Sequence, residues 1–261
     1  MSEDSSPLLR VQGVSVRFGG IVALDGVSFD VARGDICALI GPNGAGKTTL
    51  FNCISRLYPY QAGDIQFEGR SLTHVPQHQI AGLGLGRTFQ NLAMFRTLSV
   101  TDNVMVGAHA RSRSGFVASA LRLPAVSAEE RRLRDKAQEI MDYLGLTPHA
   151  HRAAGDLPFA IQKRVEMARA LAADPLLLML DEPAAGLNHE ELHTLTALVR
   201  DVRDKRGVSV LLVEHHMSMV MGLSDHIVAL NFGKKIAEGT PDHIQNHPDV
   251  IEAYLGAGAH G

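Results

Sequence analysis

The sequence predicts an α/β fold in which a mainly helical segment interrupts a core of strands and helices. One observation is an apolar run at residues 35–40 that stops at Gly41 and is followed by a helical pattern over residues 47–55. Another is an apolar run at residues 176–180 that leads directly into two acidic residues. Short apolar runs beside turn residues are typical of buried strands. The third observation is that residues 90–165 show a mainly helical pattern with few strand signals.

Four further segments complete the expected strands. Residues 11–18 alternate apolar and polar side chains, and residues 27–31 follow Gly26. Residues 208–213 are continuously apolar apart from one serine, and residues 225–237 indicate a short strand pair with a turn in the middle. Alternation and short apolar runs are the two patterns that strands produce.

The helical segment contains one well-marked helix. Ser127 with Glu130 has the spacing of a capping box and predicts a helix start there. Gly145 is a suitable C-terminal residue for that helix. An apolar stripe at helical spacing lies between them: Leu133, Ala137, Ile140 and Leu144.

Length and composition favour one globular domain. With 261 residues, 45% hydrophobic and 20% charged, the chain has room for one large domain with an insertion. We expect a single domain over residues 8–256, with a core of about 8–89 and 166–256 and a helical subdomain of about 90–165. The net charge of −3 argues against a module that binds nucleic acid by neutralising phosphates.

The sequence gives no sign of export or of a membrane span. Its two cysteines, Cys37 and Cys53, lie in apolar surroundings without CxxC spacing, which fits a reducing cytoplasm. The N-terminus lacks the layout of a signal peptide. The apolar run at residues 176–180 is far shorter than the ~20 residues that a span needs. We therefore expect a soluble chain whose membrane role, if it has one, depends on partners.

Residues 41–48 match the phosphate-loop pattern G-x₄-G-K-[ST] in full, between a predicted strand and a predicted helix. Glycines allow the backbone amides to turn toward phosphates, and the helix N-terminus adds the positive end of its dipole. Lys47 is expected to reach the β- and γ-phosphates, and Thr48 to offer its hydroxyl to Mg²⁺. The alternative is a glycine-rich turn that matches by chance. It is disfavoured because a predicted strand precedes the motif and a predicted helix follows it. The expected nucleotide-binding loop residues are Gly41, Pro42, Asn43, Gly44, Ala45, Gly46, Lys47, Thr48 and Thr49.

Two carboxylates follow the apolar run at residues 176–180. Asp181 and Glu182 are expected at the carboxyl end of a buried strand, where open α/β sheets place their ligands. Asp181 would hold Mg²⁺ through water, and Glu182 would be the general base for the attacking water. The alternative is that the acids cap the start of a helix after the strand. This alternative is plausible for one acidic residue and weak for two in succession.

Together with these motifs, three later ones resemble the ABC transporter ATPases over nearly the whole chain. Gln90 lies in Arg-Thr-Phe-Gln-Asn, residues 184–188 occupy the family's D-loop, and His215 follows a predicted strand. Alone, Gln90 would be an ordinary loop residue and His215 a strand-end histidine, but their order favours the family. The resemblance implies a P-loop NTPase core, with a RecA-like sheet and an antiparallel β subdomain. It also implies that Phe18 stacks on adenine, that Gln90 senses Mg²⁺ and the transporter, and that His215 contacts the γ-phosphate.

The family's signature motif is altered here. Where the family has Leu-Ser-Gly-Gly-Gln, residues 157–161 are Leu-Pro-Phe-Ala-Ile. In the family this helix start offers a serine hydroxyl and glycine amides to the γ-phosphate of the partner's ATP. Pro158 has neither a hydroxyl nor an N–H, although proline suits a first helical turn. Ala160 keeps its amide but restricts the backbone. We predict that the ATP site completed by this signature is the weaker of two, which favours a heterodimer.

Three segments narrow the resemblance to the LivG-type subunits of branched-chain amino acid importers. They are residues 90–95 with the long stretch that follows, residues 181–188, and the tail at 239–256. This resemblance implies a second, LivF-like ATPase, two membrane permeases and an extracytoplasmic solute-binding protein. It places the chain at the cytoplasmic face of the inner membrane as a peripheral subunit. The resemblance does not fix the solute, which stays open among branched-chain amino acids, other amino acids, amides and urea.

Other interpretations fit less of the sequence. A lipopolysaccharide-type exporter ATPase is disfavoured by the longer helical insertion, and a soluble repair or translation ABC protein by the single cassette and acidic balance. A small-molecule kinase would need the phosphate loop but not Gln90, Asn188 and His215. His189 and His193 fit the pattern H-E-x-x-H, but the apolar stripe of that helix leaves both on its polar face, so we interpret them as a solvated helix start. The basic stretch at residues 111–122 is interpreted as a solvated loop, with membrane contact as the alternative.

Overall fold

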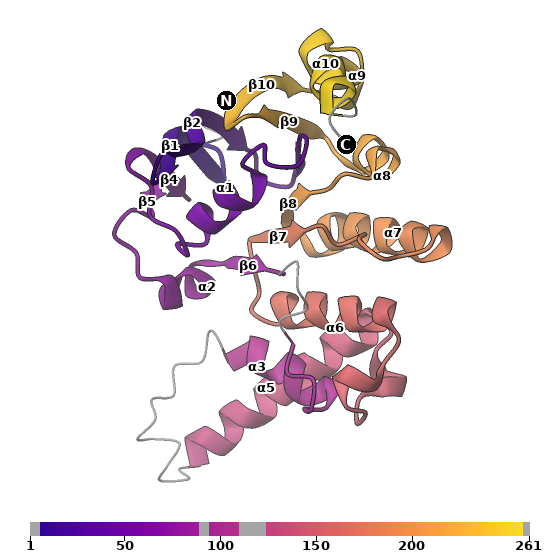
Figure 1. Ribbon diagram of the computed structural model, residues 1–261. Coiled ribbons are helices and arrows are strands. Elements are labelled where there is room, and N and C mark those ends of the chain that lie inside the picture. The colour runs from indigo at the N-terminus through magenta and orange to yellow at the C-terminus, as the bar shows by residue number, and fades with distance from the viewer. Residues whose placement is uncertain (1–5, 89–93, 110–123, 258–261) are drawn as a thin grey trace, which may run out of the picture.

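The computed structural model describes residues 6–88, 94–109 and 124–257 of the chain (Figure 1). The strands are β1 Leu9–Phe18, β2 Ile21–Val31, β3 Ile36–Ile40, β4 Ala62–Phe67, β5 Arg70–Ser71, β6 Leu85–Arg87, β7 Leu177–Asp181, β8 Ser209–Val213, β9 His226–Asn231 and β10 Lys234–Gly239. The helices are α1 Lys47–Ile54, α2 Ile80–Leu83, α3 Val100–His109, α5 Pro124–Tyr143, α6 Phe159–Leu171, α7 His189–Arg206, α8 Met217–Leu223, α9 Pro241–Gln245 and α10 Pro248–Ala257. Three short 3-10 turns occupy Gln77–Gln79, Thr147–His149 and Ala154–Asp156.

The strands form two sheets. One is a four-stranded antiparallel sheet of order β2-β1-β4-β5, and the other has six strands in the order β10-β9-β3-β8-β7-β6. In the second sheet only β10 runs antiparallel to its neighbour. Both the phosphate-loop strand β3 and its neighbour β8 are buried at every position, as a parallel sheet covered on both faces requires. The predicted α/β fold with an antiparallel β subdomain is confirmed.

The first hairpin is longer than its sequence pattern predicts. Strand β2 begins at Ile21, six residues before the expected start, and pairs with β1 from Phe18 onward. Two glycines, Gly19 and Gly20, form the connection, and Gly19 has a φ of 56°. A two-residue turn of this kind needs positive φ, which glycine adopts without steric cost.

Strand register brings three chain segments level at the carboxyl ends of neighbouring strands in the six-stranded sheet. Val213 of β8 lies beside Leu39 of β3 on one side and beside Asp181 of β7 on the other. The residues that follow these three strands therefore emerge side by side, although they are far apart in the sequence. These are the glycine-rich turn, the acidic pair and the segment with His215.

The side chains of the parallel strands alternate between two cores. Leu177 and Met179 pack with the apolar side of α1 and with the antiparallel sheet. Leu178 and Leu180 pack on the opposite face, with residues of α6 and α7. This period of two is what the pleat of a strand imposes. Helix α1 thus lies between the two sheets, and the turn at its N-terminus is anchored from both sides.

Helices α3, α5 and α6 pack together beyond the β6 edge of the sheet (Figure 1). The predicted stripe on α5 is confirmed, since Ala137, Ile140 and Leu144 are buried and Leu133 is partly buried against them. The expected helix start at Ser127 is wrong: α5 begins at Pro124, where a missing N–H costs the helix nothing.

The division of the chain at residues 90 and 165 stays a prediction, and α6 runs continuously across residue 165. No helix within the described ranges is both long and apolar enough to cross a bilayer.

Candidate functional site

The turn between β3 and α1 has the backbone conformation of a phosphate loop. Gly41, Gly44 and Gly46 have φ angles of 147°, 81° and 102°. A Cβ at Gly41 would lie 2.2 Å from the carbonyl oxygen of Leu230, and one at Gly46 would lie 2.6 Å from that of Ala23. Glycine at the first and last of these positions is therefore required by close backbone approach as well as by φ.

Lys47 begins α1 and is folded back over the loop. Its Nζ donates hydrogen bonds to the carbonyl oxygens of Gly41 at 2.7 Å and Pro42 at 3.0 Å. Burial lowers the pKa of Lys47, and the charges of Glu182 and Asp181 oppose that shift. The ammonium group therefore lies in the field of both carboxylates at the mouth of the loop. Thr48 is exposed and Thr49 is half-buried on the same first turn.

Asp181 ends β7 and is almost completely buried. Its Oδ2 accepts a hydrogen bond from Nη2 of Arg87 at 3.1 Å, whereas its Oδ1 has no hydrogen-bond partner among the described residues. Burial raises the pKa of Asp181, and the neighbouring guanidinium lowers it. Arg87 also donates to the carbonyl oxygen of Phe51 at 3.2 Å and to Oγ of Ser55 at 3.0 Å. It therefore joins α1 to β7, a contact that the sequence patterns did not reveal.

Glu182 has a φ of 47°, a conformation that long side chains rarely adopt. Its N–H donates to the carbonyl oxygen of Val213 at 2.9 Å, and its own carbonyl oxygen accepts the N–H of Ala185 at 3.2 Å. Strained backbone of this kind persists where the surroundings over-determine it, and it is frequent at functional sites.

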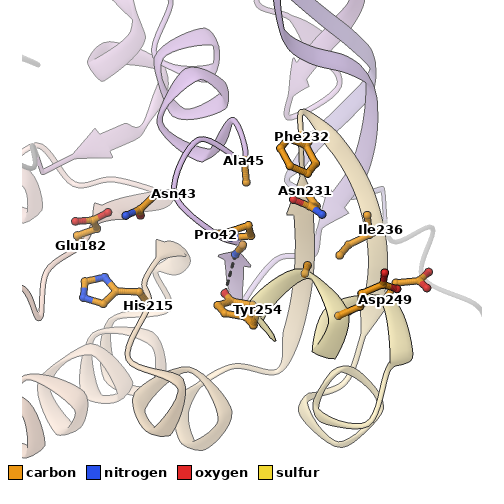
Figure 2. A pocket seen from close by; sticks show the side chains of 13 residues that line it. Pro42, Asn43, Ala45, Glu182, His215, Asn231, Phe232, Ile236, Asp249 and Tyr254 are labelled. Atoms are coloured by element: carbon orange, nitrogen blue, oxygen red, sulfur yellow. Dashed lines mark hydrogen bonds between the residues drawn. The ribbon is translucent and has the colours of Figure 1, made fainter. Parts of the chain in front are cut away.

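His215 follows β8 and faces the same opening. Its side chain is 54% exposed, and its ring lies 4.5 Å from that of His216, centroid to centroid. In Figure 2 the side chains of Asn43, Glu182 and His215 lie together on one side of the phosphate loop. The structure thus brings together the loop, the acidic pair and the histidine, as the sequence predicts.

Loop residues, Glu182 and His215 line a cavity of about 1270 Å³, large enough for a nucleotide. On its far side the cavity is bounded by the β9–β10 turn and by α10 (Figure 2). The hydroxyl of Tyr254 on α10 accepts the N–H of Gly41 at 2.9 Å, and burial raises the pKa of Tyr254. The lining residues are Gly41, Pro42, Asn43, Ala45, Glu182, His215, Asn231, Phe232, Ile236, Asp249, Glu252, Ala253 and Tyr254.

Several expected site residues are not among those that line this cavity, and Gln90 is outside the described chain: the former are Gly44, Gly46, Lys47, Thr48, Thr49, Asp181 and Phe18. Phe18 ends β1 and is 46% exposed. Its ring packs edge-to-face against that of Tyr58, with 5.4 Å between the ring centroids. It is not among the cavity's lining residues, so its expected contact with adenine stays a prediction. Gln90 and the basic stretch at residues 111–122 lie outside the described residues.

The altered signature forms the start of α6. Pro158 is its N-cap, with φ −53° and ψ 147°, and its side chain makes no capping hydrogen bond. The ring of Phe159 packs against Gly186 of the D-loop, since a Cβ there would lie 3.1 Å from it. The side-chain Nε2 of Gln162 donates a hydrogen bond to the carbonyl oxygen of Leu157 at 2.8 Å. The segment is thus held by local contacts that do not involve a serine.

Helix α7 begins at His189 behind an Asn188–Glu191 capping box, a local signal that sequence reasoning missed. Both His189 and His193 are exposed, which confirms them as a solvated helix start. Among the described residues, the potential metal ligands that gather in a group of three or more are Glu214, His215 and His216. The Glu214 oxygens already accept four N–H groups there, so the donor set is that of an internal hydrogen-bond network.

A phosphate loop at the edge of a parallel sheet, with an acidic pair beside it, defines a P-loop nucleotide-binding protein. Comparison with known families narrows this class. The family model described as ABC transporter matches residues 24–185, and the model described as branched-chain amino acid ATP-binding cassette transporter matches residues 234–260.

Similar proteins give the same assignment. The chain is 43% identical to the high-affinity branched-chain amino acid transport ATP-binding protein BraF of Pseudomonas aeruginosa, over 97% of this chain and 99% of that protein. It is 42% identical, with the same coverage, to the corresponding protein LivG of Escherichia coli K12. A crystal structure of the ADP conformation of an ATP-binding cassette of an ABC transporter superposes with a TM-score of 0.84 at 31% identity, covering 97% of this chain and all of that one. The chain therefore belongs to the ABC transporter family, among the LivG-type ATP-binding subunits, and is an ATPase.

Proposed function

We propose that this ATPase binds ATP with Mg²⁺ and uses its hydrolysis to power import of branched-chain or related amino acids or amides. The supporting observation is the level register of β3, β8 and β7, which sets the phosphate loop, Glu182 and His215 around one cavity. The similar proteins BraF and LivG are named for branched-chain amino acid transport.

The phosphates would lie against the loop amides and Lys47, with adenine stacked on Phe18. Asp181 fits a role in holding Mg²⁺, because its buried Oδ1 has no hydrogen-bond partner within the described part of the chain, and carboxylate and hydroxyl oxygens suit this cation. Thr48 and Gln90 would complete the protein's contacts to it. When bound, Mg²⁺ neutralises the charge of the β- and γ-phosphates. The chain's own residues then orient the nucleotide toward Glu182 and His215.

Glu182 would take the proton of the attacking water, and His215 would donate to the γ-phosphate. The strained backbone at Glu182 sets the direction in which its side chain leaves the chain. That side chain lies beside those of Asn43 and His215 (Figure 2). Phosphoryl transfer is accelerated mainly by positioning and electrostatic stabilisation, and both depend on geometry, so small displacements at Glu182 matter.

We further propose that this chain pairs head-to-tail with a second, LivF-like ATPase and drives two membrane permeases from the cytoplasmic face of the membrane. An extracytoplasmic binding protein would deliver the solute. Pro158 stands at the start of α6 and offers neither a hydroxyl nor an N–H to a partner's γ-phosphate, which supports a heterodimer whose two ATP sites are unequal. Restoring the family residues with Pro158→Ser and Ala160→Gly is expected to raise ATP turnover in the assembled complex. No gain in turnover would contradict the weak-site proposal.

The catalytic assignment is tested with Glu182→Gln in the assembled complex. We expect ATP to remain bound while hydrolysis falls by a factor of about 100 or more, since a general base contributes that much. Glu190→Gln, an exposed glutamate on α7, is the matched control and is expected to hydrolyse ATP at the normal rate. Unchanged hydrolysis in Glu182→Gln would rule out this residue as the base.

The transport assignment is tested in vesicles that contain the chain, its partner ATPase and the permeases. ATP-dependent uptake of leucine, isoleucine or valine, or of a related amino acid or amide, is the expected result when the binding protein is added. ATP hydrolysis that is insensitive to all of these solutes would contradict the proposed solute class.

A further inference from the structure

A glutamate directly after β8, Glu214, has a fully buried side chain and no Lys or Arg partner among the described residues. Its Oε1 accepts the N–H of Ala184 at 3.0 Å. Its Oε2 accepts the backbone N–H groups of His215 and His216, both at 2.9 Å, and lies 2.8 Å from Nδ1 of His216. Four donors from two chain segments thus converge on one carboxylate.

Burying a carboxylate costs free energy unless hydrogen bonds replace its water. Burial by itself raises the pKa of Glu214, but the hydrogen bonds from His216, Ala184 and His215 outweigh it, so the pKa lies below its ordinary value. Glu214 therefore stays ionised and keeps all its acceptor positions facing these donors. A neutral side chain of the same shape would not satisfy them equally.

The two segments that Glu214 joins carry the two groups proposed to act on the γ-phosphate. Ala184 lies two residues after Glu182, and His215 is the next residue after Glu214. The N–H of Glu182 is held separately by the carbonyl oxygen of Val213, at 2.9 Å. The strained residue is thus fixed by the end of β8 through its own N–H and, two residues later, through Ala184.

Glu214 itself does not line the nucleotide cavity, whereas Glu182 and His215 do. Its contacts to the cavity are indirect, through backbone N–H groups. Its position therefore does not indicate contact with ATP or water. It indicates that Glu214 sets the positions of Glu182 and His215.

We propose that Glu214 is a positioning residue for ATP hydrolysis, whose carboxylate clamps the segment after Glu182 to the segment of His215 and so fixes these two groups relative to each other. This inference rests on the proposed roles of Glu182 and His215.

The test is Glu214→Gln in the assembled transporter complex. The glutamine amide places an NH₂ group against N–H donors, so the hydrogen bonds to one of the two oxygens are lost. We expect kcat for ATP to fall by about tenfold or more, while KM and the Kd for ATP stay within about twofold, because the loop contacts are untouched. Faster hydrogen exchange at the Ala184, His215 and His216 amides is expected in the same variant.

A kcat within about twofold of the wild-type value would overturn the proposal. So would a loss of ATP affinity in proportion to kcat, which indicates general unfolding. Ser209→Ala is the matched control: Ser209 begins β8, is fully buried, and its Oγ accepts the N–H of Gly34 at 2.8 Å. It is expected to lose stability without losing kcat, and an equal loss of kcat would also overturn the proposal.

A second pair of variants covers the case in which Glu214→Gln does not fold. His216→Leu removes one of the four donors at a half-exposed position, and His216→Asn keeps a donor near Nδ1. We expect several-fold lower kcat for the leucine variant and recovery in the asparagine variant. Wild-type kcat in His216→Leu would overturn the clamp.

Glu182→Gln is assayed alongside. If Glu182→Gln keeps wild-type turnover, the proposed function of that residue fails. If it is inactive while Glu214→Gln is fully active, only the positioning inference fails.

Discussion

The buried pair of Arg87 and Asp181 gives the sharpest prediction for stability. The two side chains are 9% and 2% exposed, and the guanidinium also donates to Phe51 and Ser55. Arg87→Met keeps most of the side-chain volume but removes the guanidinium that pairs with the buried carboxylate. Because the ion pair and the hydrogen bonds to Phe51 and Ser55 are lost together, we expect the free energy of unfolding to fall by about 3–5 kcal/mol.

The measurement is urea unfolding without nucleotide or Mg²⁺, followed by far-ultraviolet circular dichroism because the chain has no tryptophan. The double variant Arg87→Met with Asp181→Leu removes the stranded charge and is expected to recover part of the loss, with a coupling of about 0.5–3 kcal/mol. A cost below about 1 kcal/mol for Arg87→Met would refute the reasoning, and so would a double variant less stable than the single one.

Three other predictions concern packing, a tether and pH. Gly107→Ala on α3 places a Cβ 1.9 Å from the carbonyl oxygen of Arg169, so thermal unfolding is expected at a lower temperature, by a cost of about 1–3 kcal/mol; Gly82→Ala, whose Cβ meets nothing within 4 Å, is the control that should show no such loss. Tyr254→Phe leaves the Gly41 N–H without its acceptor, so unfolding free energy should fall by about 1 kcal/mol and this amide should exchange faster; unchanged exchange would contradict the tether. Because the pKa of the Glu214 carboxyl lies below its ordinary 4.5, its contribution to stability is complete above pH 4.5 and is lost as pH falls through the folded-state pKa. The stability difference between wild type and Glu214→Gln should therefore shrink on acidification below pH 4.5, and a constant difference would contradict it.

Local patterns in the sequence determined the phosphate loop, the acidic pair and the buried strands β3, β7 and β8, but not the short strands β4, β5 and β6. Each depends on residues within one short segment: glycines that allow positive φ, and apolar runs that end in polar residues. The β9–β10 hairpin and the buried stripe of α5 were predictable for the same reason.

Only the tertiary structure decided how those segments meet. The register of β3, β8 and β7 sets three strand ends level, and no local pattern encodes pairing between strands so far apart in the chain. Arg87 and Asp181 are separated by 94 residues, so their contact exists only once β6 and β7 pair. Glu214 follows the buried strand β8 just as Glu182 follows β7, yet its hydrogen bond to Ala184 depends on strand pairing across the sheet. The sequence alone thus determined which chemical groups the site contains, and folding decided which of them hold the others in place.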